Sequence, residues 1–304
     1  MAHIRPLNSE LAKVARVELN ENENNIQENI IKLREWIVGQ TYLKARTDDQ
    51  FLLAFLRFCK YNLQNAKIRI EYYYTYKSTG MEVLKVRHID EKLLGMVRDG
   101  IFATLPNPIG PGGPRIHYTR MGNIDTSKYS VYDVFRYHTF RSEIEINTDD
   151  NWVISGVVEI IDFGKIPFAF LRQYDSGLFK KMSAFLEYGV PTNLKGTHIV
   201  NASMEAQIVL TLVRTCMKQK ELLHIHSSVQ SLQKAIGAEY LPVELGGENG
   251  TLDDAVNNFE QLLLSYDNYF NEEISYGVDE KLRNDLVTET KSSGEGSFRK
   301  LDVD

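Results

Sequence analysis

The chain has 304 residues, of which 43% are hydrophobic and 25% are charged, and this composition is typical of a folded globular protein rather than a disordered or collagen-like one. Its 35 Lys and Arg residues against 41 Asp and Glu residues give a formal net charge of −6, so the excess of positive charge expected of a nucleic-acid-binding protein is missing. Two cysteines, Cys59 and Cys216, are too few for a disulfide framework and lack the spacing of a zinc site, which favours a reducing compartment.

The first part of the chain predicts a helical unit over residues 9–80. Apolar residues from Ile26 to Ile37 recur at steps of three or four, which places them on one face of a helix. Thr47-Asp48-Asp49-Gln50 has the pattern of a capping box at the start of a helix rich in phenylalanine, and Asn62 is a candidate cap for the next helix. We therefore interpret residues 1–105 as an all-helical N-terminal lobe.

Proline and glycine are densest over residues 105–114, which predicts a loop that joins the lobe to a second domain. Beyond this loop, short apolar runs alternate with helical patterns. We predict strands at 115–119, 152–163, 198–200 and 222–226, and helices at 131–146, 173–188, 203–217, 228–236 and 256–270. Such alternation is typical of an α/β fold with a mostly parallel sheet flanked by helices. We place this second domain at residues 106–275 and a C-terminal tail at 276–304, which is loop-like or disordered from about Thr288.

The sequence offers little support for catalysis. The predicted strand that ends at Asp162-Phe163 is followed by one glycine, Gly164, whereas a dinucleotide-binding loop needs several glycines between strand and helix. No nucleotide-phosphate loop or nucleophile elbow is present. His138 and Ser142 lie one helical turn apart, but no acid can be placed to orient them, so a helix-surface contact is favoured over a nucleophile pair. We therefore expect no enzymatic activity and no cofactor.

His224 and His226 are a candidate half of a metal site, because alternate residues of a strand point to the same side. No third ligand is evident nearby in the sequence. The favoured alternative is two polar groups at the end of a strand, and we expect no bound metal.

Glu159 is a carboxylate inside the apolar run from Gly156 to Asp162. A buried carboxylate is costly unless it has a partner. Arg136, His138 and Arg141 on the preceding helix are the candidate partners. A structural ion pair and a contact with a ligand are both open interpretations, and the ion pair is favoured.

Five segments resemble, in this order, the CRAL-TRIO family and especially its tocopherol- and retinaldehyde-binding branches. They are Asp49–Arg57, Tyr132–Arg136, Gly156–Asp162, Leu194–Asn201 and Leu241–Gly247. The resemblance extends from about Asp48 to Glu273. It implies a deep apolar cavity that holds one lipophilic molecule and is closed by a mobile gate helix over Ser203 to Met217.

The resemblance also implies which residues line the cavity. On the helices and strands before the gate they are Phe135, His138, Thr139, Ser142, Val157, Glu159, Ile161, Tyr174, Met182, Phe185, Leu186 and Thr197. On the gate helix they are Val209, Leu212, Val213 and Met217. The gate sequence carries an apolar stripe made of Met204, Ile208, Val209, Leu212, Val213 and Cys216.

The chain departs from the family pattern at several positions. Leu245 replaces the usual Tyr, Glu159 falls where the tocopherol branch has a small apolar residue, and His138 falls where that branch has serine. The gate begins Asn201-Ala202-Ser203, where the family usually has Asn-x-Pro, so a stiffening proline is missing. Of the basic cluster that holds phosphoinositide headgroups in the tocopherol branch, only Lys195 keeps its charge.

These features predict a carrier of one small hydrophobic ligand, which we expect to be a retinoid, a tocopherol or a related lipid such as a phospholipid. The alternative is a phosphoinositide-responsive membrane adaptor or signalling scaffold with a vestigial pocket. The sequence has no apolar run of about 18 residues and its first residues lack the apolar core of a secretory signal. We therefore expect a cytoplasmic monomer that meets a membrane surface transiently and binds no nucleic acid.

Overall fold

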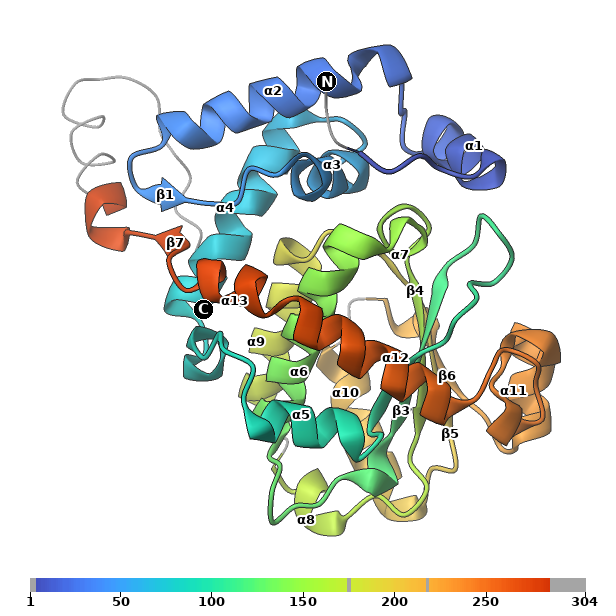
Figure 1. Ribbon diagram of the computed structural model, residues 1–304. Coiled ribbons are helices and arrows are strands. Elements are labelled where there is room, and N and C mark those ends of the chain that lie inside the picture. The colour runs from blue at the N-terminus through green and yellow to red at the C-terminus, as the bar shows by residue number, and fades with distance from the viewer. Residues whose placement is uncertain (1–3, 174–175, 217–218, 285–304) are drawn as a thin grey trace.

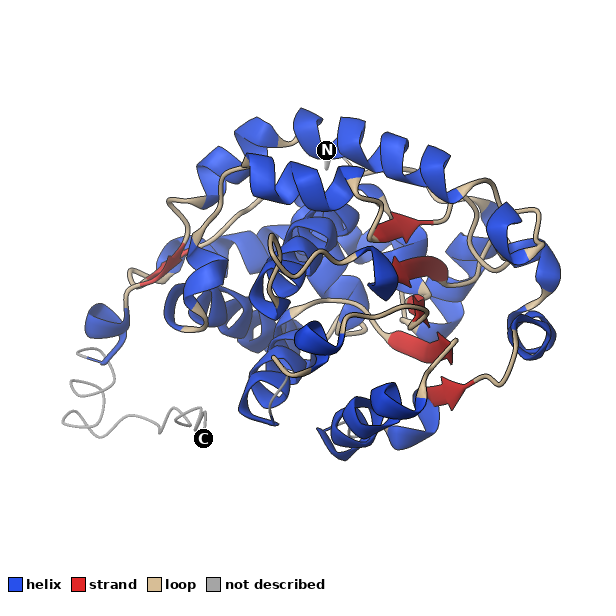
Figure 2. Ribbon diagram, turned by 90° about the horizontal axis from the view of Figure 1, so that it is seen from below, coloured by secondary structure: helices blue, strands red, loops and turns tan. Residues whose placement is uncertain are grey.

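A five-stranded sheet with helices on both faces forms the centre of the second part of the chain, in a computed structural model that describes residues 4–173, 176–216 and 219–284 (Figure 1). The strand order is β2-β3-β4-β5-β6; β2 and β3 are antiparallel and the other neighbours are parallel. Figure 2 shows the strands nearly end-on, between the helices of the two faces. The predicted α/β class with a mostly parallel sheet is confirmed.

The strands are β1 (Leu43–Lys44), β2 (Phe102–Thr104), β3 (Arg115–Arg120), β4 (Val157–Asp162), β5 (Leu194–Val200), β6 (Leu223–Ile225) and β7 (Gly277–Val278). The α-helices are α1 (Ser9–Glu18), α2 (Glu23–Gly39), α3 (Asp49–Phe58), α4 (Leu63–Thr79), α5 (Glu91–Arg98), α6 (Val131–Thr148), α7 (Asp150–Ile154), α8 (Phe168–Leu171), α9 (Ser176–Ala184), α10 (Met204–Cys216), α11 (Val229–Ile236), α12 (Leu252–Ser265) and α13 (Asp267–Glu273). A π-helical turn, Phe185–Gly189, follows α9, and short 3-10 turns lie at Glu82–Lys85, Met121–Asn123, Lys220–Leu222, Ala238–Tyr240 and Val243–Leu245.

Helices α1 to α4 form the predicted helical lobe. The Asn62 side chain accepts a hydrogen bond from the Asn65 amide and caps α4, as predicted. The predicted capping box at Thr47–Gln50 is wrong. Asp48 is the cap residue and its side chain makes no capping bond, while the Gln50 side-chain oxygen accepts a hydrogen bond from the Arg5 amide instead.

The Pro/Gly segment 105–114 connects β2 to β3, two antiparallel strands of the same sheet. The prediction that it joins the lobe to the second domain is therefore wrong, because the sheet already begins at Phe102. Strand β2 has only three residues and follows α5 after a short turn at residues 99–101, which is too short for a strand pattern to stand out in the sequence. The domain limits at 105 and 275 stay a prediction.

The apolar run 152–163 is a helical turn followed by a strand, not one strand. The Asp149 side chain accepts a hydrogen bond from the Trp152 amide and so starts α7. Gly156 then has a φ of +88°, which an L residue rarely adopts, and it lies against the Asn193 carbonyl. A continuous apolar run does not distinguish a buried helical turn from a buried strand.

The last predicted helix, 256–270, is two helices, α12 and α13, which meet at Tyr266. They carry the chain back across the second domain towards the lobe (Figure 1). There β7 pairs antiparallel with β1, so residues assigned to the tail contribute a strand to the lobe. Residues 288–304 lie outside the described residues.

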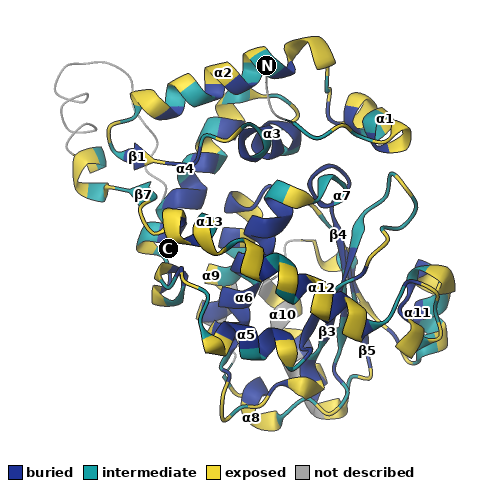
Figure 3. Cartoon of the chain, viewed as in Figure 1, coloured by how far each residue is buried: buried dark blue, intermediate teal, exposed yellow. Residues whose placement is uncertain are grey.

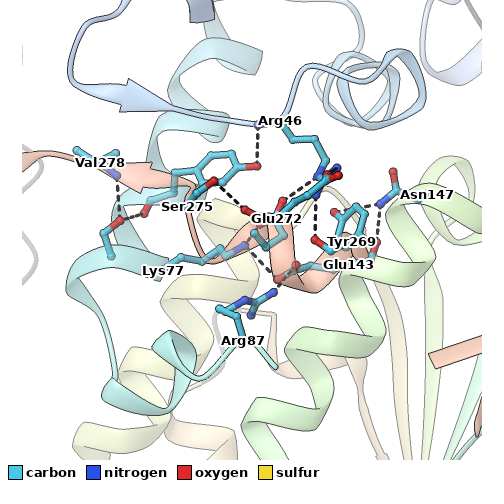
Figure 4. Close-up of polar contacts among 12 residues, drawn as sticks. Arg46, Lys77, Arg87, Glu143, Asn147, Tyr269, Glu272, Ser275 and Val278 are labelled. Atoms are coloured by element: carbon cyan, nitrogen blue, oxygen red, sulfur yellow. Dashed lines mark hydrogen bonds and ion pairs between the residues drawn. The ribbon is translucent and has the colours of Figure 1, made fainter. Parts of the chain in front are cut away.

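A buried ionic cluster, the junction cluster, joins the lobe to the second domain (Figure 4). It consists of Arg46, Lys77, Arg87, Glu143 and Glu273, all of which are buried. Arg46 Nε lies 2.8 Å from Glu273 Oε1, and Lys77 Nζ lies 3.3 Å from Glu143 Oε1. Lys77 also pairs with Glu273, and Arg87 pairs with Glu143. The cluster thus ties α4 and the segment before α3 to α6 and to the end of α13.

Candidate ligand-binding site

The inner face of the sheet is the face towards α6. Because strand residues alternate, Val157, Glu159 and Ile161 of β4 share this face, whereas Val158 and Ile160 pack with α11 and α12 on the other. The parallel register places Glu159 beside His117 of β3 and Thr197 of β5. Glu159 therefore lies at the middle of the inner face.

Helix α6 covers this face and is buried along most of its length (Figure 3). It begins at a capping box in which Ser130 and Asp133 bond each other's backbone amides. From Asp133 to Ile146 every residue is buried except His138, which keeps accessible surface. This accessible surface makes His138 a candidate for contact with a bound ligand.

The inner face of β4 also keeps accessible surface where a tightly packed core would leave none. The Glu159 side chain keeps 19% of its accessible surface, and Ile161 is also only half-buried, although β4 is the middle strand of the sheet. A fully packed core would leave such positions without accessible surface. The candidate ligand site is therefore the space between Glu159 and Ile161 of β4 and His138 of α6.

A group of five charged and histidine side chains, the inner polar cluster, borders this space. Its members are His117, His138, Arg141, Glu145 and Glu159. His117 lies between two carboxylates, with Nε2 2.6 Å from Glu145 Oε1 and Nδ1 2.9 Å from Glu159 Oε1. Arg141 Nη2 donates to Glu159 Oε1 at 3.2 Å and to His138 Nδ1 at 2.9 Å. The cluster is thus one connected network.

The charges of the network determine its protonation. Burial alone would raise the pKa of Glu159, but His117 and Arg141 outweigh burial and hold that pKa well below its usual range. Burial and Arg141 lower the pKa of His117, yet Glu145 and Glu159 outweigh them and raise it. For His138, burial and then Arg141 lower the pKa to about 3. Glu159 is therefore ionised and His138 neutral at pH 7.

Of the three partners predicted for Glu159, Arg141 is confirmed and Arg136 is wrong. Arg136 points to the other side of α6, where it pairs with Asp90 at 2.8 Å. His117 is a further partner, and its proximity comes from the register of β3 on β4 and not from its position in the sequence. His138 is linked to Glu159 through Arg141, because Arg141 Nη2 donates to both side chains.

The other predicted lining residues lie as follows. Those buried are Phe135, Thr139, Ser142, Val157, Phe185 and Thr197, and Met182 is half-buried. The hydroxyls of Thr139 and Ser142 donate to the carbonyls of Phe135 and His138 at 3.0 and 2.7 Å, so their protons are already used. Leu186 is 45% exposed and Lys195 is exposed. The part these residues play in binding stays a prediction.

Helix α10 is the predicted gate helix. Tyr174 and Met217 lie outside the described residues, as do the side chains of Ile208, Val209, Leu212, Val213 and Cys216. Of the predicted apolar stripe, Met204 is the member whose side chain is described, and the role of the stripe stays a prediction. Met204 is 83% exposed, whereas Ala206 and Leu210 of α10 are buried in the same apolar core as Phe170 of α8 and Leu178 of α9.

Sequence comparisons agree with this architecture. The family model for the CRAL/TRIO domain matches residues 99–247, which contain the five-stranded sheet and the inner polar cluster. Residues 99–247 belong to the CRAL-TRIO family. A second family model, for the Pinta-like UBA domain, matches residues 22–94 of the helical lobe.

The CRAL-TRIO chain is similar along most of its length to the clavesins. Human clavesin-2 is 27% identical over 285 residues, which are 92% of this chain and 85% of that protein. Clavesin-1 of Pongo abelii is 29% identical over 261 residues, 81% of this chain and 71% of that protein. The crystal structure of Sfh5 superimposes with a TM-score of 0.44 at 12% identity, over 83% of this chain and 92% of that one. The family assignment therefore rests on the sequence matches.

Among the described parts of this CRAL-TRIO chain, no helix is both long enough and apolar enough to cross a membrane.

The two histidines predicted as half of a metal site gain a third neighbour. His198 joins His224 and His226 at the edge of the sheet, because β5 pairs with β6 there, and His198 Nδ1 lies 2.9 Å from His226 Nε2. Within the same described residues, no group of three His, Cys, Asp or Glu side chains is arranged to hold a metal ion.

The neutral state of His138 predicts a pH dependence of stability. An unfolded chain protonates this histidine below about pH 6.5, whereas the folded protein resists protonation until about pH 3. The free energy of unfolding should therefore fall as pH is lowered below 6.5, by up to about 1.4 kcal/mol per pH unit from this residue. Urea denaturation between pH 6.5 and 5 should show a shallower fall for His138→Gln, which keeps an acceptor for Arg141. His88→Gln at the surface is the matched control; an equal fall in wild type and His138→Gln would contradict the prediction.

Proposed function

We propose that this CRAL-TRIO protein carries one small hydrophobic ligand, a retinoid, a tocopherol or a related lipid, in the space between β4 and α6. The observation that carries the proposal is the accessible surface kept by Glu159, Ile161 and His138 inside the domain. Phe135, Val157 and Phe185 belong to the apolar core against which Ile161 packs. Burial of about 400 Å² of apolar ligand surface is worth roughly 10 kcal/mol. This exceeds the roughly 8 kcal/mol of micromolar binding, so such an affinity needs few polar contacts.

Helix α10 is the proposed gate. Asn201 lies shortly before Met204, the first residue of α10, and has a φ of +56°. Its side-chain amide donates to Asp162 Oδ1 at 2.9 Å. Asp162 ends β4, so this contact holds the approach to α10 against the sheet. Transfer would require α10 to swing about this point at a membrane surface, where the exposed Met204 meets lipid first.

The proposal is tested by native mass spectrometry and organic extraction of the purified protein. We expect about one lipid molecule per chain and saturable binding of retinol or tocopherol by the stripped protein. A protein that carries no lipid and binds neither compound would overturn the proposal.

A space-filling variant tests the location of the site. Ile161→Trp places a large side chain in the proposed space and should lower lipid occupancy at least fivefold, because the ligand and the indole compete for one volume. Val243→Trp adds the same side chain at a position that is 54% exposed and should keep wild-type occupancy. Lipid occupancy is read from extracted lipid per mole of protein; equal occupancy in the two variants would place the ligand elsewhere.

A further inference from the structure

We infer that Asp162 and Asn201 form a latch that sets how fast α10 opens and takes no part in binding the ligand. This inference rests on the proposed function, because it concerns the proposed gate. It goes further because it names the contact that resists opening. It also predicts that loss of this contact changes the rates of ligand entry and release but not the affinity.

Asp162 connects three segments of the chain. It is the last residue of β4, and its Oδ1 accepts hydrogen bonds from the Gly164 amide at 2.7 Å and from the Asn201 side-chain amide at 2.9 Å. Its Oδ2 accepts from the hydroxyl of Tyr118 in β3 at 3.0 Å. Tyr118 is 2% exposed, whereas Asn201 is exposed. The sheet therefore holds the carboxylate in place, and Asn201 is the partner that belongs to the approach to α10.

The backbone at Asn201 makes the bend between β5 and α10. Asn201 follows the last residue of β5 and has a φ of +56°, a left-handed conformation that is uncommon for any residue other than glycine. Such residues at the end of an element are typical of hinges and switch regions. Residue 203 is a serine, and no proline fixes the backbone between residues 201 and 204. The bend therefore depends on non-covalent contacts, of which the bond to Asp162 is one.

The latch lies on the face of the sheet opposite the candidate ligand site. Because alternate strand residues share a face, Asp162 lies on the face of Val158 and not on that of Glu159. Tyr118, which bonds Asp162, packs in the same apolar cluster as Val158. A change in the latch therefore leaves the inner polar cluster and the space beside it in place.

This position gives the latch a distinct kinetic signature. Since the contact does not involve the ligand, it stabilises the closed protein equally with and without ligand. Its loss makes opening easier by the same factor in both forms, so entry and release should become faster together. The dissociation constant, which is their ratio, should stay the same. Loss of a contact with the ligand would instead weaken affinity, mainly through faster release.

The experiment compares Asn201→Gly and Asn201→Asp with the wild-type full-length protein. Glycine keeps the left-handed backbone and removes the side-chain donor. Aspartate keeps the side-chain shape and also tolerates this conformation, but it places a second carboxylate against Asp162. Entry and release of retinol or tocopherol are followed by stopped-flow ligand fluorescence, with phosphatidylcholine vesicles as acceptors. We expect both rates to rise by about threefold or more, the factor for one lost hydrogen bond, at an unchanged dissociation constant.

Lys165→Gly is the matched control. Lys165 is exposed, lies in the neighbouring loop after β4 and has a similar φ of +59°. Its side chain is not one of the three donors to Asp162, so both rates should stay at their wild-type values. Equal acceleration in Lys165→Gly and Asn201→Gly would overturn the inference, because the rates would then respond to loop flexibility in general.

The remaining outcomes separate the latch from the carrier function. Urea denaturation establishes that the compared proteins are folded. Unchanged rates in both Asn201 variants, or faster release with unchanged entry and weaker affinity, would overturn the latch and leave the carrier function standing. Absence of saturable binding of either ligand by the wild-type protein would overturn the carrier function, and the latch with it.

Discussion

Glu273→Ala should lower the free energy of unfolding by about 3–5 kcal/mol, the usual result of removing one partner of a buried ion pair. Glu273 is 2% exposed and accepts from Arg46 Nε at 2.8 Å and from Lys77. Without it, the junction cluster keeps three buried cations and only Glu143 as a buried anion. Urea denaturation at pH 7 measures the loss as a lower midpoint.

The neighbouring residue supplies a matched control. Glu272 lies 3.1 Å from Arg46 Nη1, but its side chain is 62% exposed, and an exposed ion pair is worth roughly 0–1 kcal/mol. Glu272→Ala should therefore shift the unfolding free energy by less than about 1 kcal/mol. Equal losses for the two variants would show that burial of Glu273 is not what makes the junction cluster important.

Phe140→Ala should also lower the free energy of unfolding by about 3–5 kcal/mol, in this case through a cavity in the core. Phe140 is fully buried in α6, and its ring centroid lies 4.3 Å from that of Phe270 in α13. The truncation removes packing between α6, which borders the candidate ligand site, and α13, which returns to the lobe.

The control for this variant is Phe168→Ala, because Phe168 is 57% exposed at the start of α8. A surface truncation of this kind usually changes stability by about 0.5 kcal/mol or less. Both variants are compared by urea denaturation at the same pH. A loss below 1 kcal/mol for Phe140→Ala would contradict the assignment of Phe140 to a tightly packed core.

Local signals predicted the elements that depend on local interactions. Asn62 caps α4 as expected, since a cap needs only a side chain and an amide three residues on. The strands and helices after residue 115 follow the predicted order. The local signal failed at Trp152, which lies in a helix, because a short apolar run is equally compatible with a buried turn and a buried strand.

The candidate site also shows that local sequence signals do not predict which side chains meet in the folded protein. The sequence marked Glu159 as an unusual carboxylate within an apolar run and proposed three partners on one helix. Which of them faces it depends on how α6 is rotated on the sheet, and this rotation turns Arg141 towards Glu159 and Arg136 towards Asp90. Neither rotation nor register is encoded in the spacing of the residues themselves.

The sequence by itself determined the α/β class, the order of most strands and helices, and the CRAL-TRIO family, because periodicity, caps and motif order are properties of short stretches of chain. Only the tertiary structure decided the two clusters that matter most. Arg46 and Glu273 are 227 residues apart in the chain, and His117 meets Glu159 only through the register of β3 on β4. A shift of that register by one residue would turn His117 to the opposite face of the sheet, so the contact between His117 and Glu159 is a product of packing.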